Sequence, residues 1–217
     1  MIIRAINKIK EDIKVIYNND PAAKNILEVL FCYPGLQALI CHRIAHKLNY
    51  WNIPFLPRLI SYFARIITGV EIHPAATIGE RCFIDHGTGV VIGETTIIGD
   101  DVLIYQQVTL GGTGKEIGKR HPTIGNNVIL GAGAKVLGNI KIEHNCRIGA
   151  GSVVINDVPE SSTVVGIPGR VVHQECLSED GVLMHNRIPD PITCDLKRLT
   201  YEVQELKEEL EKLRNNN

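Results

Sequence analysis

The sequence predicts a parallel β-helix preceded by a helical domain, and the main evidence is a repeat of six residues. A period of six fits neither an α-helix nor simple strand alternation, but it is typical of solenoids whose coils stack on one another. Three hexads complete one roughly triangular coil, and adjacent coils then lie about 4.8 Å apart, as neighbouring strands do. The repeated branched aliphatic residues are Ile72, Ile78, Ile84, Ile92, Ile98, Ile104, Leu110, Ile124, Leu130, Val136, Ile142, Ile148 and Val154.

A second residue of each hexad is also expected to point inward. It follows most of the aliphatic residues by four positions and is usually smaller: Ala76, Cys82, Thr96, Val102, Val108, Val128, Ala134, Ile140, Cys146, Ser152 and Val158. Glycine often stands next to the inward aliphatic residue, where a tight corner favours it. No helical pattern separates the hexads, which argues against a βαβ domain, and thirteen regular positions argue against a sandwich of short strands.

Residues 1–69 are expected to form a helical domain. Asp20-Pro21 has the composition of an N-cap followed by proline at the first helical position, which predicts a helix through Leu27. Pro34-Gly35 ends this helix, and a second amphipathic helix is predicted over about residues 36–48. The apolar stretch 51–69 contains two prolines and two arginines, so it predicts a packing helix and not a membrane span. This block could cover the first coil, whose backbone edges would otherwise be unpaired.

The solenoid is expected over residues 70–172, and residues 173–217 are expected to form a linker and an amphipathic helix. Two prolines, at 189 and 191, mark a hinge. After them, apolar residues recur in steps of three and four at Leu196, Leu199, Val203, Leu206, Leu210 and Leu213. This heptad pattern is compatible with an oligomerisation coil or with a helix folded onto its own solenoid.

Composition and charge argue against several classes of partner. The chain has 23 Lys and Arg against 24 Asp and Glu, for a net charge of −1, and no basic stripe that would indicate nucleic-acid binding. Six cysteines without a CxxC pair indicate reduced thiols and not a disulfide framework. The first twenty residues lack the apolar core and cleavage site of a signal peptide. We therefore expect a cytoplasmic protein with no membrane segment.

The first interruption of the repeat, between Ile84 and Ile92, inserts two residues around Asp85-His86. His86 is the leading candidate for catalysis because histidine titrates near neutrality and can remove a proton from a hydroxyl group. Glu71 lies fifteen residues earlier, about one coil below, where a carboxylate could orient the imidazole. A corner histidine bonded to the backbone is the structural alternative.

The second interruption, between Leu110 and Ile124, is a glycine-rich excursion that contains Arg120-His121. An arginine fork binds a carboxylate in bidentate geometry, and a loop that leaves a rigid solenoid is a suitable place to hold a substrate. A solvated arginine is the alternative. Gly111–Lys115 does not match a P-loop, since no Gly-Lys-Ser/Thr sequence closes it before a helix.

Several motifs in succession resemble the hexapeptide-repeat acetyltransferases and, among them, the serine O-acetyltransferases. Hexapeptide proteins of many kinds contain Ile-Gly-Ala-Gly, whereas Asp-His-x-Thr-Gly followed by Gly-Gly-Thr-Gly-Lys and Arg-His-Pro is much more specific. The resemblance covers roughly residues 15–172. Its motifs are Glu71-Ile-His-Pro-Ala-Ala, Asp85-His-Gly-Thr-Gly-Val-Val-Ile-Gly-Glu, Val108-Thr-Leu-Gly-Gly-Thr-Gly-Lys, Arg120-His-Pro-Thr-Ile, Ile129-Leu-Gly-Ala-Gly-Ala-Lys-Val-Leu-Gly-Asn-Ile, Ile148-Gly-Ala-Gly-Ser-Val-Val, Gly166-Ile-Pro-Gly-Arg and Asp20-Pro-Ala.

The resemblance implies a left-handed parallel β-helix that assembles into trimers, sometimes paired as hexamers, with active sites between neighbouring subunits. It implies transfer of acetyl from acetyl-CoA, the co-substrate, to the hydroxyl of L-serine, which gives O-acetyl-L-serine for cysteine biosynthesis. No metal is expected.

The resemblance also assigns roles to residues. His86 would be the general base, with Glu71 as its carboxylate partner. The serine ammonium would be held by Asp20 and Asp85, and the serine carboxylate by Arg120 and His121. The pantetheine arm would lie near Gly112, Ala132 and Ala150, where small residues allow close approach.

This chain departs from the family pattern in three ways. Glu71 stands where family members usually carry Asp, so the partner of the histidine is one methylene longer. The helical region is shorter than in the hexameric members, which favours a homotrimer. The chain ends in Asn215–Asn217 and not in the Ile-terminated tail that binds O-acetylserine sulfhydrylase in relatives, so that partnership is not expected.

Three other functions remain open from the residues alone. An O-acetyltransferase acting on a sugar or another hydroxyl acceptor would share His86 but would not need Asp20, Asp85 and Arg120 together. A zinc hydratase on the same architecture would need three converging histidines. A non-catalytic scaffold would use the solenoid and the heptad helix to organise partners.

Overall fold

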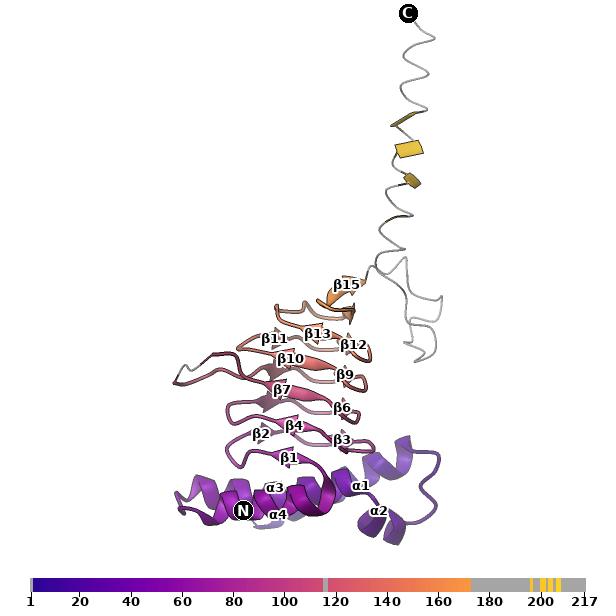
Figure 1. Cartoon of the computed structure of the whole chain (residues 1–217). Helices are drawn as coiled ribbons and strands as arrows, with labels where there is room; N and C mark the ends of the chain where they lie inside the picture. The colour runs from indigo at the N-terminus through magenta and orange to yellow at the C-terminus, as the bar shows by residue number, and fades with distance from the viewer. Residues whose placement is uncertain are drawn as a thin grey trace, which may run out of the picture.

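The computed structural model describes residues 2–114 and 117–172, together with seven single positions between 196 and 207. Four helices stand at one end of a solenoid of short strands, and β15 lies at the opposite end (Figure 1). The helices are α1 (Ile2–Asn19), α2 (Ile26–Cys32), α3 (Pro34–Tyr50) and α4 (Leu56–Thr68).

The strands form three sheets, which we name A, B and C in the order in which each coil visits them. Sheet A contains β1 (Glu71–Ile72), β4 (Val91–Ile92), β7 (Thr109–Gly111), β10 (Lys135–Leu137) and β13 (Val153–Val154). Sheet B contains β2 (Thr77–Ile78), β5 (Ile97–Ile98), β8 (Thr123–Ile124) and β11 (Lys141–Ile142). Sheet C contains β3 (Phe83–Ile84), β6 (Leu103–Ile104), β9 (Ile129–Leu130), β12 (Arg147–Ile148), β14 (Thr163–Val165) and β15 (Arg170–Val172).

The predicted β-helix is confirmed. All thirteen aliphatic residues of the repeat are buried, with exposures of 6% or less, and they stack on one another through parallel pairing of successive coils. The second inward set is buried too, except Ile140, which is only partly buried. A single cluster of these side chains fills the solenoid, so its core is continuous from the first coil to the last.

The two interruptions lengthen particular coils without breaking the stacking. Regular coils have 18 residues, as from Ile92 to Leu110 and from Val136 to Val154. The coil from Ile72 to Ile92 is two residues longer, and the coil from Leu110 to Val136 is eight residues longer. In both cases the strand pairs keep their register, so the additional residues leave the solenoid at its corners.

The helical block covers the first coil, as expected. Ala38 and Leu39 of α3 belong to the same buried cluster as the solenoid core. A methyl group on Gly35 would lie 2.0 Å from the carbonyl oxygen of Ile84, so only glycine allows α3 to approach β3 this closely. The guanidinium of Arg43 bonds both the Asp12 carboxylate, at 2.6 and 2.9 Å, and the Gly79 carbonyl, which fixes α1 and α3 to the solenoid.

The expected helix beginning at Asp20-Pro21 is wrong. α1 ends at Asn19, the residues after it form a turn, and α2 begins only at Ile26. Asn25 is the N-cap, since its side chain accepts a hydrogen bond from the Glu28 N–H at 2.9 Å. The Asp20 carboxylate has other partners, described below. The break before a second helix is confirmed, but it comes earlier than predicted: α2 ends at Cys32, and Pro34-Gly35 are the first two residues of α3, which continues to Tyr50.

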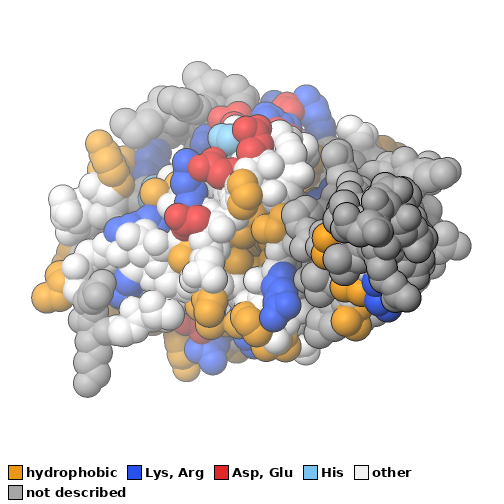
Figure 2. Space-filling model, turned by 90° about the horizontal axis from the view of Figure 1, so that it is seen from above, with side chains coloured by type: hydrophobic (Ala, Val, Ile, Leu, Met, Phe, Trp, Pro, Cys, Tyr) orange, Lys and Arg blue, Asp and Glu red, His pale blue; other side chains and the backbone are white. Residues whose placement is uncertain are grey.

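The far end of the solenoid is closed by β15, which pairs with β14 in antiparallel fashion and covers part of the last coil. Viewed along the solenoid from this end, acidic and basic side chains gather along one edge around a histidine (Figure 2). Most of residues 173–217, including the predicted linker, lies outside the described residues. The seven described positions there are helical and exposed, and among them are Leu196, Val203 and Leu206. In the described parts of the chain, no helix is both long enough and apolar enough to cross a bilayer.

Candidate active site

The first interruption places His86 on the surface, at the corner where the chain passes from sheet C to sheet A. Its side chain is 72% exposed, and Nε2 lies 3.8 Å from Oδ2 of Asp85. His86 has a φ of 60° and Gly87 a φ of 67°, both in the left-handed region. A side chain on Gly87 would meet Val70 at 2.8 Å, so the loop needs glycine there. The imidazole is therefore accessible and lies beside a carboxylate.

Asp20 faces the same corner from the turn between α1 and α2. Its Oδ1 accepts a hydrogen bond from the Ala22 N–H at 2.8 Å, and its Oδ2 accepts one from the Tyr33 hydroxyl at 2.5 Å. The Tyr33 hydrogen bond, the Ala22 hydrogen bond and the nearby His86 charge together lower the pKa of Asp20. The C/A corner thus combines two carboxylates, Asp20 and Asp85, with one histidine.

Glu71 lies on the outer face of β1, and its carboxylate pairs with Arg65 of α4 at 3.0 Å. The expected contact with His86 is not made within this chain: the Glu71 carboxylate pairs with Arg65, and the ion-pair partner of His86 is Asp85. The physical reason is the position of α4, which brings a guanidinium to the longer glutamate side chain. Sequence reasoning did not identify Arg65, whose partner is set by the docking of a helix.

Arg120 and His121 lie at a different corner, where the chain passes from sheet A to sheet B. Arg120 forms an ion pair with Glu94. The backbone N–H groups of Arg120 and His121 both donate to the Thr95 hydroxyl, at 3.0 and 3.1 Å. A methyl group on Gly93 would lie 2.0 Å from the His121 ring, so that glycine makes room for the imidazole. The coil that carries Glu94 and Thr95 therefore anchors the long loop.

The His121 ring is 8% exposed, and burial, followed by the Arg120 charge, lowers its pKa. Its Nδ1 lies 3.2 Å from the Thr95 N–H, from which it accepts a hydrogen bond. A neutral imidazole that accepts at Nδ1 carries its proton on Nε2. His121 is thus a hydrogen-bond donor through Nε2. Sequence reasoning missed Thr95 and Glu94, although Glu94 ends the quoted Asp85 motif and so offered a signal.

The three small residues expected along the pantetheine arm are divided between these corners. Ala132 and Ala150 stack in successive coils at the C/A corner, where the Gly151 N–H donates to the Ala132 carbonyl at 2.8 Å. Gly112 lies at the A/B corner, next to Arg120 and His121. The single chain therefore presents two groups of predicted site residues, one on each edge of sheet A.

His86 and the residues that hold Arg120 and His121 lie at the same level along the solenoid. His86 lies in the loop that leads into β4, whereas Glu94 and Thr95, which hold Arg120 and His121, lie in the turn that follows β4. No hydrogen bond or ion pair joins the two groups in the described chain. A zinc hydratase would need three converging histidines, but His144 lies at the remaining corner, between β11 and β12, and so does not converge with His86 and His121 within the chain. Within the described ranges, no cluster of three or more His, Cys, Asp or Glu side chains is arranged to hold a metal ion.

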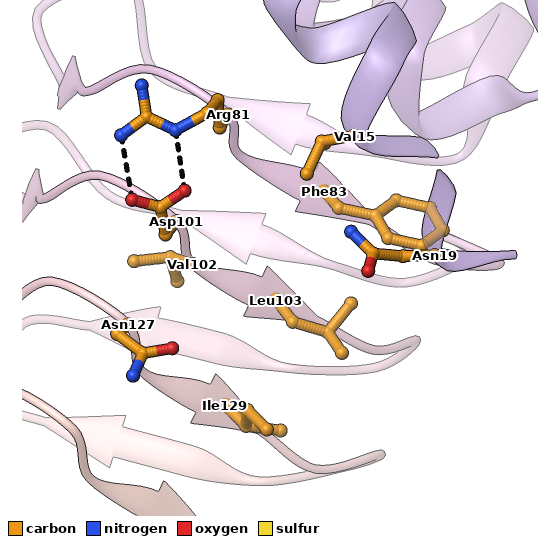
Figure 3. Close-up of a pocket in the computed structure, with 9 residues that line it drawn as sticks. All are labelled: Val15, Asn19, Arg81, Phe83, Asp101, Val102, Leu103, Asn127 and Ile129. Carbon is orange, nitrogen blue, oxygen red and sulfur yellow. Dashed lines mark hydrogen bonds and ion pairs between the residues drawn. The ribbon is translucent and has the colours of Figure 1, made fainter. Parts of the chain in front are cut away.

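A cavity of about 480 Å³ lies along the outer face of sheet C, away from both groups (Figure 3). Phe83, Leu103 and Ile129 from three successive coils form its floor, and α1 lies to one side. Arg81 and Asp101 form a bidentate pair at its edge, at 2.6 and 2.7 Å. None of the predicted site residues lines it, so this cavity is not where the sequence places the chemistry.

Comparison with known proteins gives consistent matches. A model of the bacterial transferase hexapeptide family (six repeats) matches residues 121–156. The serine acetyltransferase of Synechococcus elongatus is 58% identical over 202 residues, which cover 93% of this chain and 82% of that protein. The solved structure of Neisseria gonorrhoeae serine acetyltransferase in complex with serine has a TM-score of 0.76 at 43% identity, covering 79% of this chain and 70% of that one.

A serine acetyltransferase solved in complex with CoA is also similar, with a TM-score of 0.74 at 42% identity over 77% of this chain and 70% of that chain. The chain shares the fold of these solved structures over most of its length, and it is identical to a serine acetyltransferase at more than half of the aligned positions. This chain belongs to the serine acetyltransferase family.

Proposed function

We propose that this serine acetyltransferase forms O-acetyl-L-serine, for cysteine biosynthesis, at active sites shared between neighbouring chains of a homotrimer, with acetyl-CoA as the acetyl donor. The observation that carries the shared site is that His86 lies at one edge of sheet A, whereas Arg120 and His121 are held at the other edge, at the level of β4. Rotation about an axis parallel to the solenoid, without translation, brings the C/A corner of one chain level with the A/B corner of the next. The similar structures with bound serine and bound CoA support both ligands.

In this proposal His86 is the general base. Its imidazole takes the proton of the serine hydroxyl while the hydroxyl oxygen attacks the thioester carbonyl carbon. The tetrahedral intermediate then expels the CoA sulfur, and the imidazolium returns the proton to the thiolate. The exposed position of His86 suits this role, because both substrates must reach it.

The serine zwitterion needs anchors of both signs. Asp20 and Asp85 supply negative charge for the ammonium at the C/A corner. Arg120 and His121 of the neighbouring chain supply donors for the carboxylate: part of the Arg120 fork is held by Glu94, and His121 offers Nε2–H. Asp20 is held by Tyr33, and Arg120 is held by Glu94, before the substrate arrives, which lowers the ordering cost of binding.

Two further assignments complete the proposed site. The pantetheine arm lies along the column of small residues at Ala132 and Ala150, and Gly112 of the neighbouring chain lies one coil nearer the helical block than Ala132. Glu71 stays a candidate partner for His86, since Arg65 engages only its Oε2. In that arrangement the carboxylate would bridge a guanidinium and an imidazole.

The C-terminal heptads support parallel association of neighbouring chains. With Leu196 at position a, Glu202 and Glu209 occupy g positions, and Lys207 and Arg214 occupy the e positions five residues later. That spacing pairs opposite charges between parallel helices. The described side chains of this stretch are exposed in the single chain, which is expected for a helix whose apolar face packs against other chains. The free thiols of Cys32, Cys41, Cys82 and Cys146 support a reducing, cytoplasmic location.

The direct test measures CoA release with L-serine, homoserine and a galactoside as acceptors, for the wild type and for His86→Asn. We expect L-serine to give the fastest turnover, and the variant to lose about 10²–10⁴-fold in kcat with unchanged thermal unfolding. Turnover with the galactoside but not with L-serine would identify a sugar acetyltransferase. Full activity of His86→Asn would remove His86 from the mechanism.

A further inference from the structure

Tyr33 lies beside the C/A corner but belongs to none of the motifs that predicted the site. It occupies the junction between α2 and α3, where it is the last residue before the proline that starts α3. Its half-buried ring packs against a small cluster that includes Ile16, Leu36 and Phe83. Only its hydroxyl reaches the site, where it donates to Oδ2 of Asp20.

The backbone around Tyr33 is fixed against the catalytic loop. Gly35, two residues later, is in close contact with Ile84, which directly precedes Asp85-His86. A methyl group on Gly87 would lie only 3.6 Å from the Gly35 nitrogen, so the start of α3 also borders the other side of the loop. Tyr33 is thus attached to the same rigid unit as His86.

Asp20 has no such attachment of its own. It lies in a turn after α1, and the Ala22 N–H that binds its Oδ1 is part of the same turn. The Tyr33 hydroxyl is the hydrogen-bond donor that ties the Asp20 side chain to the α3 junction, across thirteen positions of sequence. Without it, the described contacts leave the carboxylate fixed only by a local turn.

We propose that Tyr33 is a positioning residue for the substrate ammonium, which holds the Asp20 carboxylate toward His86 and Asp85. This inference rests on the proposed function, in which Asp20 binds the ammonium group. A carboxylate has about four acceptor sites, so the two existing hydrogen bonds leave room for the ligand.

The electrostatics agree with a permanent donor. The Asp20 hydrogen bond, burial and the charges of Asp20, Glu28 and Asp85 raise the pKa of Tyr33 to about 12. The hydroxyl therefore keeps its proton across the physiological range and can only donate to Asp20. In turn this hydrogen bond lowers the pKa of Asp20, so the anion is present whenever serine binds.

The test uses Tyr33→Phe, which removes the hydroxyl and keeps the packed ring. Loss of one hydrogen bond to a charged group predicts about a tenfold or larger rise in KM for L-serine. We expect kcat to change by less than about threefold, and the KM for acetyl-CoA and thermal unfolding to stay near wild-type values, because the reacting atoms are untouched. Tyr17→Phe, on exposed α1 surface, is the matched control and should leave all four quantities unchanged.

The same substitution in an Asp20→Asn background distinguishes positioning from a general structural role. If Tyr33 acts through Asp20, the two effects on the KM for L-serine combine non-additively, and Tyr33→Phe adds little to Asp20→Asn. Additive effects, an unchanged KM in Tyr33→Phe, or a parallel rise in both KM values would each overturn the inference. If Asp20→Asn itself leaves the KM for L-serine unchanged, the proposed role of Asp20 fails first, and this inference fails with it.

Discussion

A site shared between chains predicts that two inactive variants restore activity when they assemble together. His86→Ala damages the C/A corner and leaves the A/B corner intact, whereas Arg120→Ala does the reverse. Each variant alone should have little turnover, because every site then lacks either the general base or the carboxylate anchor. A mixed trimer can combine one intact corner from each type of chain.

The expected recovery follows from the arrangement of corners in a ring of three. In a mixed trimer, an intact active site needs its C/A corner from an Arg120→Ala chain, which retains His86, and its A/B corner from a His86→Ala chain, which retains Arg120. With random mixing in equal amounts, each condition holds for half of the chains, so about one quarter of the sites are intact. If trimers that contain both variants are purified through two different tags, each has one intact site, and turnover should reach about one third of the wild type.

The assay is CoA release at saturating L-serine and acetyl-CoA, on co-expressed chains whose mass confirms three per assembly. The control mixes His86→Ala with Asp85→Ala, both at the C/A corner, and this pair should show no recovery because no chain in the mixture then has an intact C/A corner. Activity of the first mixture no higher than the mean of its parents would refute a site divided between chains. Recovery in the control mixture would show that Asp85 and His86 do not act from one chain.

Two predictions concern the stability of the helical block. Burial, with smaller contributions from His46 and Arg43, lowers the pKa of His42 to about 3. The pKa of histidine in the unfolded chain is about 6.5, so the unfolded state binds this proton first as the pH falls. The free energy of unfolding should therefore decrease by about 2 kcal/mol between pH 7 and pH 5. Denaturant unfolding at a series of pH values should show a smaller pH dependence of the unfolding free energy in His42→Leu than in the wild type. The same pH dependence in both proteins would contradict this prediction. Arg43→Met leaves the buried Asp12 carboxylate without its ion-pair partner and should lower the free energy of unfolding by about 3–5 kcal/mol. Arg81→Met removes an exposed ion pair and should lower it by less than about 1 kcal/mol. Equal losses in the two variants would contradict the assigned burial of the Asp12–Arg43 pair.

The solenoid could be predicted from sequence because its determinants repeat. Each inward residue occupies an equivalent environment, so a period of six over thirteen positions specifies both the strands and their register. The helical block lacks this redundancy. Asp20 has a strong N-cap preference, but its carboxylate bonds Tyr33 in the folded chain, and Asn25 caps α2 instead. A tertiary contact outweighed a local preference of about 1 kcal/mol.

The partners of the site residues were harder to predict than the site residues themselves. His86 and Arg120 interrupt a regular pattern and are visible for that reason. Arg65 and Tyr33 interrupt nothing: their roles depend on where α4 and the start of α3 dock, which no short motif encodes. The pairing of Glu71 with Arg65 shows the consequence, since the coil spacing alone suggested His86 as the partner.

The positions of the two interruptions are also the reason why the proposed active site needs more than one chain. Each leaves the solenoid at a corner, and the two corners are separated by the width of sheet A, whose parallel pairing is continuous through both insertions. Neither loop can move toward the other without breaking that pairing. Because His86 and the residues that hold Arg120 flank the same strand, β4, the proposed closed ring of parallel solenoids would place them level, whereas any translation along the axis would misalign them. In the proposed function, cyclic assembly is therefore the arrangement in which a rigid solenoid would join its two half-sites.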